Sequence, residues 1–202
     1  MKFSQGLRTS LLFSLCCLPL GVLLVGVATN RLGVNPTETL IRELGQWALR
    51  FLLITLTATP ARRWFGWGLL LSYRRMLGLF GFFYGILHLI GFIWFEHFFN
   101  WQELLADVVK RPFITLGMLA LILLLPLAIT STRRAVKRLG FRGWQRLHRL
   151  LYLAVSLALI HFFLLVKADL LEPFIYLGVW LLLLISRLPD RFFVRLRKRA
   201  SG

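Results

Sequence analysis

The chain has 202 residues, 58% of them hydrophobic, and a mean hydropathy of +0.73. This apolar content exceeds the ~45 to 50% typical of soluble domains and excludes an ordinary soluble enzyme. The net charge of +17 does not indicate a nucleic-acid-binding protein, because the basic residues alternate with long apolar runs. We therefore predict an all-α, polytopic membrane bundle in which residues 1–202 form a single domain.

The first predicted membrane span is the apolar run from Leu11 to Ala28. The basic residues before it resemble the start of a signal peptide, but its length suits a membrane span, so we predict a retained helix. Cys16 and Cys17 are adjacent within this run and show no metal-binding spacing. We interpret both as packing residues.

The second predicted span runs from about Gly45 to Thr59 and is expected to stop at Pro60. Arg50 lies about one turn inside it, where its long stem can carry the charge to the membrane interface. We expect this span to be short.

The third predicted span, from about Arg75 to Phe95, has small residues and a histidine on one face: Gly78, Gly81, Gly85 and His88. At ~100° per residue these four positions fall within roughly 80° of one another. The smooth strip suits a close crossing with a neighbouring helix, and it suits a flat macrocycle equally well. Both interpretations stay open.

Three further spans complete the predicted bundle. The fourth runs from about Phe113 to Thr130 and contains Pro126, which should kink or end it. The fifth is a single apolar helix from Gly143 to Lys167 that carries His148 and His161, and the sixth runs from about Pro173 to Ile185. We therefore expect six transmembrane helices.

The charges orient this bundle. With six spans, 19 of the 25 basic residues fall on one side and seven of the eight acids on the other. The positive-inside rule then places both termini in the cytoplasm. An error of one span would mix the two groups, which supports the number six.

His88 and His161 have matching predicted depths. His88 lies 13 residues beyond Arg75, and His161 lies 13 residues beyond His148, so each is roughly 20 Å from the cytoplasmic boundary. A membrane histidine often serves helix packing, but an ionisable residue at this depth is a candidate functional residue. Two such imidazoles suit the axial positions of a haem iron. His97 lies on the opposite helix face near the outer surface, so we do not expect it to belong to this site.

The cytoplasmic level lacks a second histidine. The third-span position that matches His148 in depth is Arg74 or Arg75. His148 then ligates a second haem with an unusual or absent sixth ligand, or it serves a flavin or quinone head group. On an ideal helix His148 and His161 point about 140° apart, so they do not face one partner without distortion. The arginines would attract a phosphate or propionate.

The outer loop from Glu96 to Lys110 combines aromatic and acidic side chains: Phe98, Phe99, Trp101, Glu103 and Asp107. This combination suits a transient interface with a soluble partner. An aromatic belt at the membrane surface explains the same aromatic residues equally well.

Several stretches, in this order, resemble one protein family. They are RRMLGLFGFFYGILHL from Arg74, RPFITLG from Arg111, LAITSTRRAVKRLG from Leu127 and WQRLHRLLYL from Trp144, followed by His161 in the same helix. They look like the MsrQ (YedZ) family, the haem-binding membrane subunits of bacterial methionine sulfoxide reductase systems. That family belongs to the ferric reductase-like transmembrane superfamily. The resemblance covers roughly residues 35 to 190.

The resemblance implies one or two b-type haems, with His88, His148 and His161 as the matching iron ligands, and FMN as a further cofactor reported for the family. It implies a bacterial inner-membrane protein that takes electrons from a quinol or a cytoplasmic flavin reductase. These electrons would pass to a periplasmic molybdopterin-dependent reductase that repairs oxidised proteins. The chain would carry electrons without itself reducing methionine sulfoxide, and without FAD or NADPH domains it is not expected to oxidise NADPH unaided.

Three other classes of membrane protein fit less well. A cytochrome b561-like quinol-oxidising subunit, serving another periplasmic acceptor, would offer four histidines in two complete pairs. A non-redox transporter would be expected to place acids or broken helices at the midplane, whereas the outer acids here lie in or beside predicted loops. A purely structural subunit does not account for three histidines at two matched depths.

Overall fold

The structure, a computed structural model, describes residues 5–166 and 169–187. This part of the chain forms helices and no strands: α1 (Gln5–Ala28), α2 (Pro36–Phe65), α3 (Gly68–His97), α4 (Trp101–Lys110), α5 (Pro112–Ile129), α6 (Arg133–His148), α7 (Leu150–Leu165) and α8 (Leu171–Ile185). Lys2, Lys167 and the basic tail beyond Arg187, which entered the charge count, lie outside the described residues.

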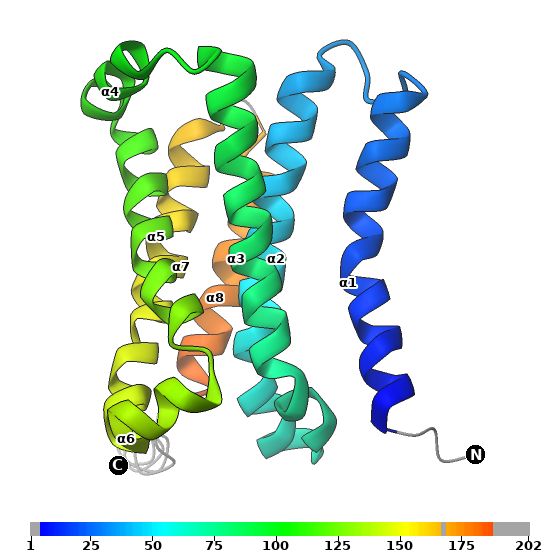
Figure 1. Cartoon of the computed structure of the whole chain (residues 1–202), viewed down its shortest axis with the longest axis vertical. Coiled ribbons are helices and arrows are strands. Elements are labelled where there is room, and N and C mark those ends of the chain that lie inside the picture. Colours follow the sequence, from blue (N-terminus) through cyan, green and yellow to red (C-terminus); the bar gives the residue numbers. More distant parts are fainter. Residues whose placement is uncertain (1–4, 167–168, 188–202) are drawn as a thin grey trace, which may run out of the picture.

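The long helices lie side by side and the short ones sit at the ends. α1, α2, α3, α5, α7 and α8 run along the long axis of the molecule, whereas α4 and α6 lie at its opposite ends (Figure 1). We call the end at α4 the outer end and the end at α6 the inner end. α1 begins and α8 ends at the inner end (Figure 1).

Several helices are built to cross a membrane. α1, α3, α5 and the segment Arg133–Leu165, which comprises α6 and α7, are long and apolar enough to do so, and α8 is apolar but shorter. α2 has 30 residues but is less apolar, because Gln46 and Arg50 interrupt its hydrophobic stretch. The prediction of an all-α, multi-pass membrane protein is confirmed.

α2 does not end at Pro60 as expected but continues to Phe65. Proline has no N–H group, so the carbonyl of Leu56, four residues earlier, loses its usual helix partner. Arg187, just after α8, donates a hydrogen bond from Nη2 to this carbonyl at 2.7 Å. An arginine that follows another helix therefore replaces the bond that the proline removes. α2 ends about one turn later at Phe65 and is capped by Gly66, whose φ of 70° favours glycine.

The single helix predicted from Gly143 to Lys167 is interrupted. α6 ends at His148 and α7 begins at Leu150. Around Arg149 the backbone makes the tighter three-residue bonds of a 3₁₀ turn, from Arg149 N–H to the Arg146 carbonyl and from Tyr152 N–H to the Arg149 carbonyl. His148 and His161 therefore lie on two adjoining helices.

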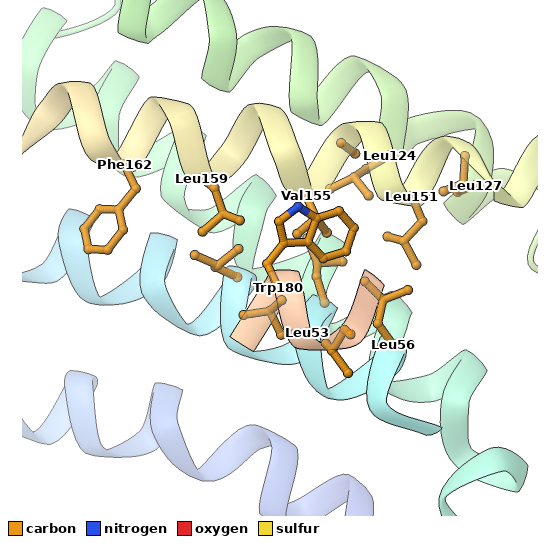
Figure 2. Close-up of a cluster of buried hydrophobic side chains, with 13 residues drawn as sticks. Leu53, Leu56, Leu124, Leu127, Leu151, Val155, Leu159, Phe162 and Trp180 are labelled. Carbon is orange, nitrogen blue, oxygen red and sulfur yellow. The ribbon is translucent and has the colours of Figure 1, made fainter. Parts of the chain in front are cut away.

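Buried apolar side chains of α2, α5, α7 and α8 meet in one cluster around Trp180 (Figure 2). Its buried members are Leu49, Leu52, Leu53, Leu56, Leu124, Leu127, Leu151, Ala154, Val155, Leu159, Phe162, Trp180 and Leu183. Lipid tails are as apolar as leucine, so such a core stabilises a membrane protein mainly through close van der Waals packing. This packing fixes the height of α7 relative to α2 and α5.

A tyrosine side chain of α3 inserts between two hydrogen-bonding groups of the α1 backbone and so joins the two helices. Tyr84 is fully buried, and its hydroxyl donates to the Cys16 carbonyl at 2.9 Å and accepts from the Leu20 N–H at 3.0 Å. In a regular helix that N–H and that carbonyl would bond to each other. The tyrosine is thus inserted next to Pro19, where α1 already lacks one backbone donor. Cys16 is buried in the same contact, in keeping with a packing role.

Candidate functional site

The imidazoles of His88 and His161 face each other between α3 and α7. Their ring centres lie 6.2 Å apart and their planes are inclined by 79°. Two imidazoles that bind one metal ion through nitrogens at ~2 Å each have their ring centres about 6 Å apart. The structure therefore brings together the two histidines that the sequence placed at one depth, at a separation that suits a shared metal ion.

Each of these histidines is oriented by a backbone carbonyl of a neighbouring helix. Nδ1 of His88 lies 2.8 Å from the carbonyl oxygen of Ile41, and Nδ1 of His161 lies 2.6 Å from that of Phe113. A carbonyl oxygen only accepts hydrogen bonds, so Nδ1 carries the proton in both rings. The lone pair is then on Nε2, the nitrogen that a metal ion binds.

A glycine makes room for each ring. Gly45 follows Ile41 by one helical turn, and a Cβ atom at this position would come 2.9 Å from Nδ1 of His88. Gly117 follows Phe113 by one turn, and a Cβ atom there would come 2.9 Å from Nδ1 of His161. The same arrangement of carbonyl, glycine and histidine thus occurs twice, once between α2 and α3 and once between α5 and α7.

The glycine strip of α3 serves helix packing. A Cβ atom at Gly81 would come 2.6 Å from a methyl carbon of Leu52 in α2, and one at Gly85 would come 2.8 Å from a methyl carbon of Leu121 in α5. Gly78 lies against Thr55 of α2. Of the two interpretations left open by the sequence, the close helix crossing is the one that these contacts support.

His148 is not brought to the other two histidines. Its Nε2 lies 3.2 Å from the hydroxyl oxygen of Thr130 at the end of α5, and its ring centre lies 3.9 Å from that of Trp144. The Thr130 hydroxyl donates to the Pro126 carbonyl at 2.6 Å, so it accepts from His148, whose Nε2 carries the proton. His148 thus has the opposite tautomer to the outer pair, with its lone pair on Nδ1.

Of the two arginines predicted to lie at the same depth as His148, only Arg74 interacts with it. Arg74 interacts electrostatically with His148, Tyr152 and Arg187, whereas Arg75 is exposed. Arg187 lies over the Tyr152 ring, 5.1 Å from its centre. The sequence offered no signal for Arg187, because it stands among the basic residues that follow the last span. The inner end therefore holds two neighbouring guanidinium groups, of which that of Arg74 lies near His148.

Arg50 does not extend to the membrane interface as expected. It lies midway along α2, donating from Nε to the Tyr176 hydroxyl and from Nη2 to the Gln46 side-chain oxygen, both at 2.7 Å. Gln46 in turn donates to Glu172 at 2.7 Å, and Arg50 lies 3.7 Å from Glu43. The one-turn spacing of Glu43, Gln46 and Arg50 was a signal for this polar network between α2 and α8.

Comparisons with known proteins agree with this architecture. The family described as ferric reductase like transmembrane component matches residues 44–159. A protein of Rhodospirillum rubrum named "Protein-methionine-sulfoxide reductase heme-binding subunit MsrQ" is 50% identical over 205 residues, covering 100% of this chain and 95% of its own length. Proteins of the same name from Herminiimonas arsenicoxydans and Caulobacter vibrioides are 49% and 47% identical, covering 88% and 92% of this chain and 83% and 89% of their own lengths. The chain therefore belongs to the MsrQ family of ferric reductase-like membrane proteins.

Proposed function

We propose that this protein is a membrane electron carrier that binds a b-type haem between His88 and His161 and passes electrons to a methionine sulfoxide reductase. The observation that carries the proposal is the facing pair of imidazoles, each with Nδ1 held by a carbonyl and Nε2 left as a lone-pair donor. The relatives named as haem-binding subunits support haem as the group that this pair holds.

The protein's own residues would set the properties of this haem. Bound haem iron supplies one-electron chemistry by alternating between ferric and ferrous states. The hydrogen bonds that His88 and His161 donate to the carbonyls of Ile41 and Phe113 would fix the ring tautomers and make Nε2 a stronger electron-pair donor to iron. The close packing of α3 against α2 and α5 would hold the two rings at one height.

For the topology, we propose six membrane spans, formed by α1, α2, α3, α5, α7 and α8, with both termini in the cytoplasm of a bacterial cell and the protein in its inner membrane. The basic residues of α6 support this orientation, because the positive-inside rule assigns them to the cytoplasmic side. The outer end, with the acids of α4, then faces the periplasm.

For electron entry, we propose an inner cofactor held by His148 and Arg74, with Arg75 at its exposed edge. Arg74 and Arg187 are neighbouring like charges, and an anionic group between them would offset their repulsion. Such a group is a propionate of a second haem or the phosphate of FMN. Ligation of a second haem iron by His148 through Nε2 would require the hydrogen bond to Thr130 to break. The donor is a membrane quinol or a cytoplasmic flavin reductase.

For electron exit, we propose that a periplasmic molybdopterin-dependent reductase docks at the outer end. His88 and His161 lie nearer the outer end of the bundle than His148 does. Electrons that enter beside His148 would therefore cross the membrane to reach the docked reductase. The methionine sulfoxide chemistry takes place on that partner.

A reduced-minus-oxidised spectrum of the purified protein tests the proposal. We expect the sharp absorption bands of low-spin, bis-histidine haem to appear on reduction with dithionite. A protein purified from haem-replete cells without such bands would overturn the electron-carrier function.

A further inference from the structure

A polar pocket of about 380 Å³ lies at the outer end of the bundle, where α3 ends and α5 begins, under the short helix α4. The charged and polar residues that line it are Glu96, His97, Glu103, Asp107, Lys110 and Arg111. Figure 1 shows α4 at this end of the molecule, above the upper end of α5. The pocket is separate from the His88 and His161 pair and from the inner arginines.

His97 is buried in this pocket without a hydrogen-bond partner. The residue is 7% exposed, and neither of its ring nitrogens has a partner among the residues described. Its Nε2 lies 3.6 Å from the Asp107 carboxylate, beyond hydrogen-bond distance. A buried polar group without a partner costs free energy, which a donor placed between the ring and the carboxylate would recover. The sequence placed His97 near the outer surface, and its burial was missed.

The pocket carries more negative charge than it neutralises. Asp107 is paired with Arg111, whose Nε lies 3.3 Å from it. Glu96 and Glu103 are exposed at the pocket and have no ion pair within residues 5–166 and 169–187, while Lys110 is the remaining cation on the rim. Two free carboxylates therefore face one free ammonium group, which favours a positively charged occupant.

The occupant suited to this pocket is a side chain rather than a metal ion. Within the described ranges no group of three or more His, Cys, Asp or Glu side chains is arranged to hold a metal. An ammonium or guanidinium group instead offers several N–H donors, enough for two carboxylates and a ring nitrogen together.

The surroundings of the pocket suit a protein partner. Exposed aromatic side chains stand beside it on the last turn of α3 and the turn into α4: Trp94, Phe98, Phe99 and Trp101. Aromatic side chains are enriched in protein interfaces relative to the rest of the surface. Glu96 also lies eight residues beyond His88 on α3, which is about 12 Å along the helix axis. A partner seated here would stand directly above the outer histidine pair.

We propose that this pocket receives a lysine or arginine side chain of the soluble electron acceptor and so places that acceptor over the outer haem. The inference rests on the proposed function, because it assumes that electrons leave at the outer end. It adds the chemistry of recognition: the acceptor presents a basic side chain to the carboxylates of Glu96, Glu103 and Asp107 and to the buried ring of His97.

Two small oxidants of opposite charge test the pocket without the partner. The haem-loaded protein in neutral nanodiscs is reduced and mixed in a stopped-flow instrument with hexaammineruthenium(III), a cation, or with ferricyanide, an anion. The variant is the double substitution Glu96→Gln and Glu103→Gln, both at exposed positions. The matched control is Glu38→Gln, an exposed acid at the start of α2.

At low salt the double substitution should lower the rate of haem oxidation by the cation about threefold or more, while the rate with the anion stays equal or rises. Salt at about 0.5 M should remove this difference, because it screens exposed charges. The Glu38→Gln protein should behave like the wild type. Equal rate changes with both oxidants, or no change with either, would overturn the pocket as a cation site.

The same proteins are then mixed with the soluble methionine sulfoxide reductase in its oxidised form. We expect the double variant to transfer electrons several-fold more slowly at low salt, with haem content and dithionite reduction unchanged. An altered response to the small oxidants with an unaltered rate to the reductase would show that the cation site is not the docking site. Failure of the underlying electron-carrier function is recognised separately, since no haem band would then be present to follow.

Discussion

Gly45 of α2 lies so close to His88 of α3 that a Cβ atom on the glycine would come 2.9 Å from Nδ1 of the histidine. This close approach lets the ring reach the Ile41 carbonyl. The glycine therefore determines the orientation of a side chain on a different helix, and Gly117 does the same for His161.

Gly45→Ala and Gly117→Ala should each disturb the haem site. The added methyl group has to push the imidazole aside and break its hydrogen bond to the carbonyl, at a cost of about 0.5–1.5 kcal/mol. We expect lower haem occupancy or a shifted Soret band, measured as haem per protein and as the absorption spectrum. Gly178→Ala in α8 is the control, because a Cβ atom there meets nothing within 4 Å. Wild-type spectra in both test variants would contradict the assigned orientation.

His88→Ala and His161→Ala should each abolish the outer haem, because each residue is proposed to supply one of its two axial bonds. Haem content and the reduced spectrum of each purified variant provide the measurement. Full haem occupancy with an unchanged spectrum in both single variants would refute the ligand assignment.

His148→Ala should leave the outer haem bound but block its reduction from the inner end. The reason is that His148 contacts Thr130 and Trp144 and does not touch His88 or His161. The measurement is haem reduction by a flavin reductase or a quinol in reconstituted vesicles, with dithionite as the control reductant. Normal reduction by the physiological donor would show that electrons enter elsewhere, and loss of all haem would show that the two levels depend on each other.

Replacement of Phe98 and Trp101 by alanine should slow electron delivery to the soluble reductase several-fold without changing haem content. Both side chains are exposed at the outer end, 79% and 59% respectively, and are available to a partner. Trp64→Ala provides the control, because Trp64 is equally exposed but lies near the inner end of α2. An unchanged transfer rate would favour a role at the membrane surface instead.

Tyr84→Phe should destabilise the bundle. Removing the hydroxyl leaves the Leu20 N–H and the Cys16 carbonyl without their partner in an apolar region, which costs about 1–3 kcal/mol. A lower thermal unfolding midpoint in detergent is the expected result. The comparison is Tyr73→Phe, also in α3, and the idea fails if both substitutions lower the midpoint equally.

The depths of His88 and His161 were predictable from the sequence because a helix rises by a constant amount per residue. Counting residues from the basic residues at the cytoplasmic end of a span therefore gives the depth of a residue in the membrane, once the order of the spans is known. The same counting also anticipated that His148 would lie at the other end of the bundle.

The groups that orient these histidines were not predictable in this way. Ile41 and Phe113 lie on helices remote in sequence from the rings they contact, so the choice of partner depends on which helices become neighbours. The passage of α2 through Pro60 depends likewise on Arg187, a residue that joins it only in the folded bundle. Local propensity argues for a helix end at proline, and a long-range hydrogen bond overrides it.

The insertion of Tyr84 beside Pro19 also constrains the order in which the protein assembles. Hydrocarbon provides no water to satisfy the Leu20 N–H, and the hydroxyl that does so belongs to a helix synthesised later. α1 therefore reaches its final backbone geometry only after α3 has entered the bilayer beside it. Until then the Leu20 N–H and the Cys16 carbonyl can bond to each other as in a regular helix, so the arrival of Tyr84 exchanges one bond within α1 for two bonds that join α1 to α3.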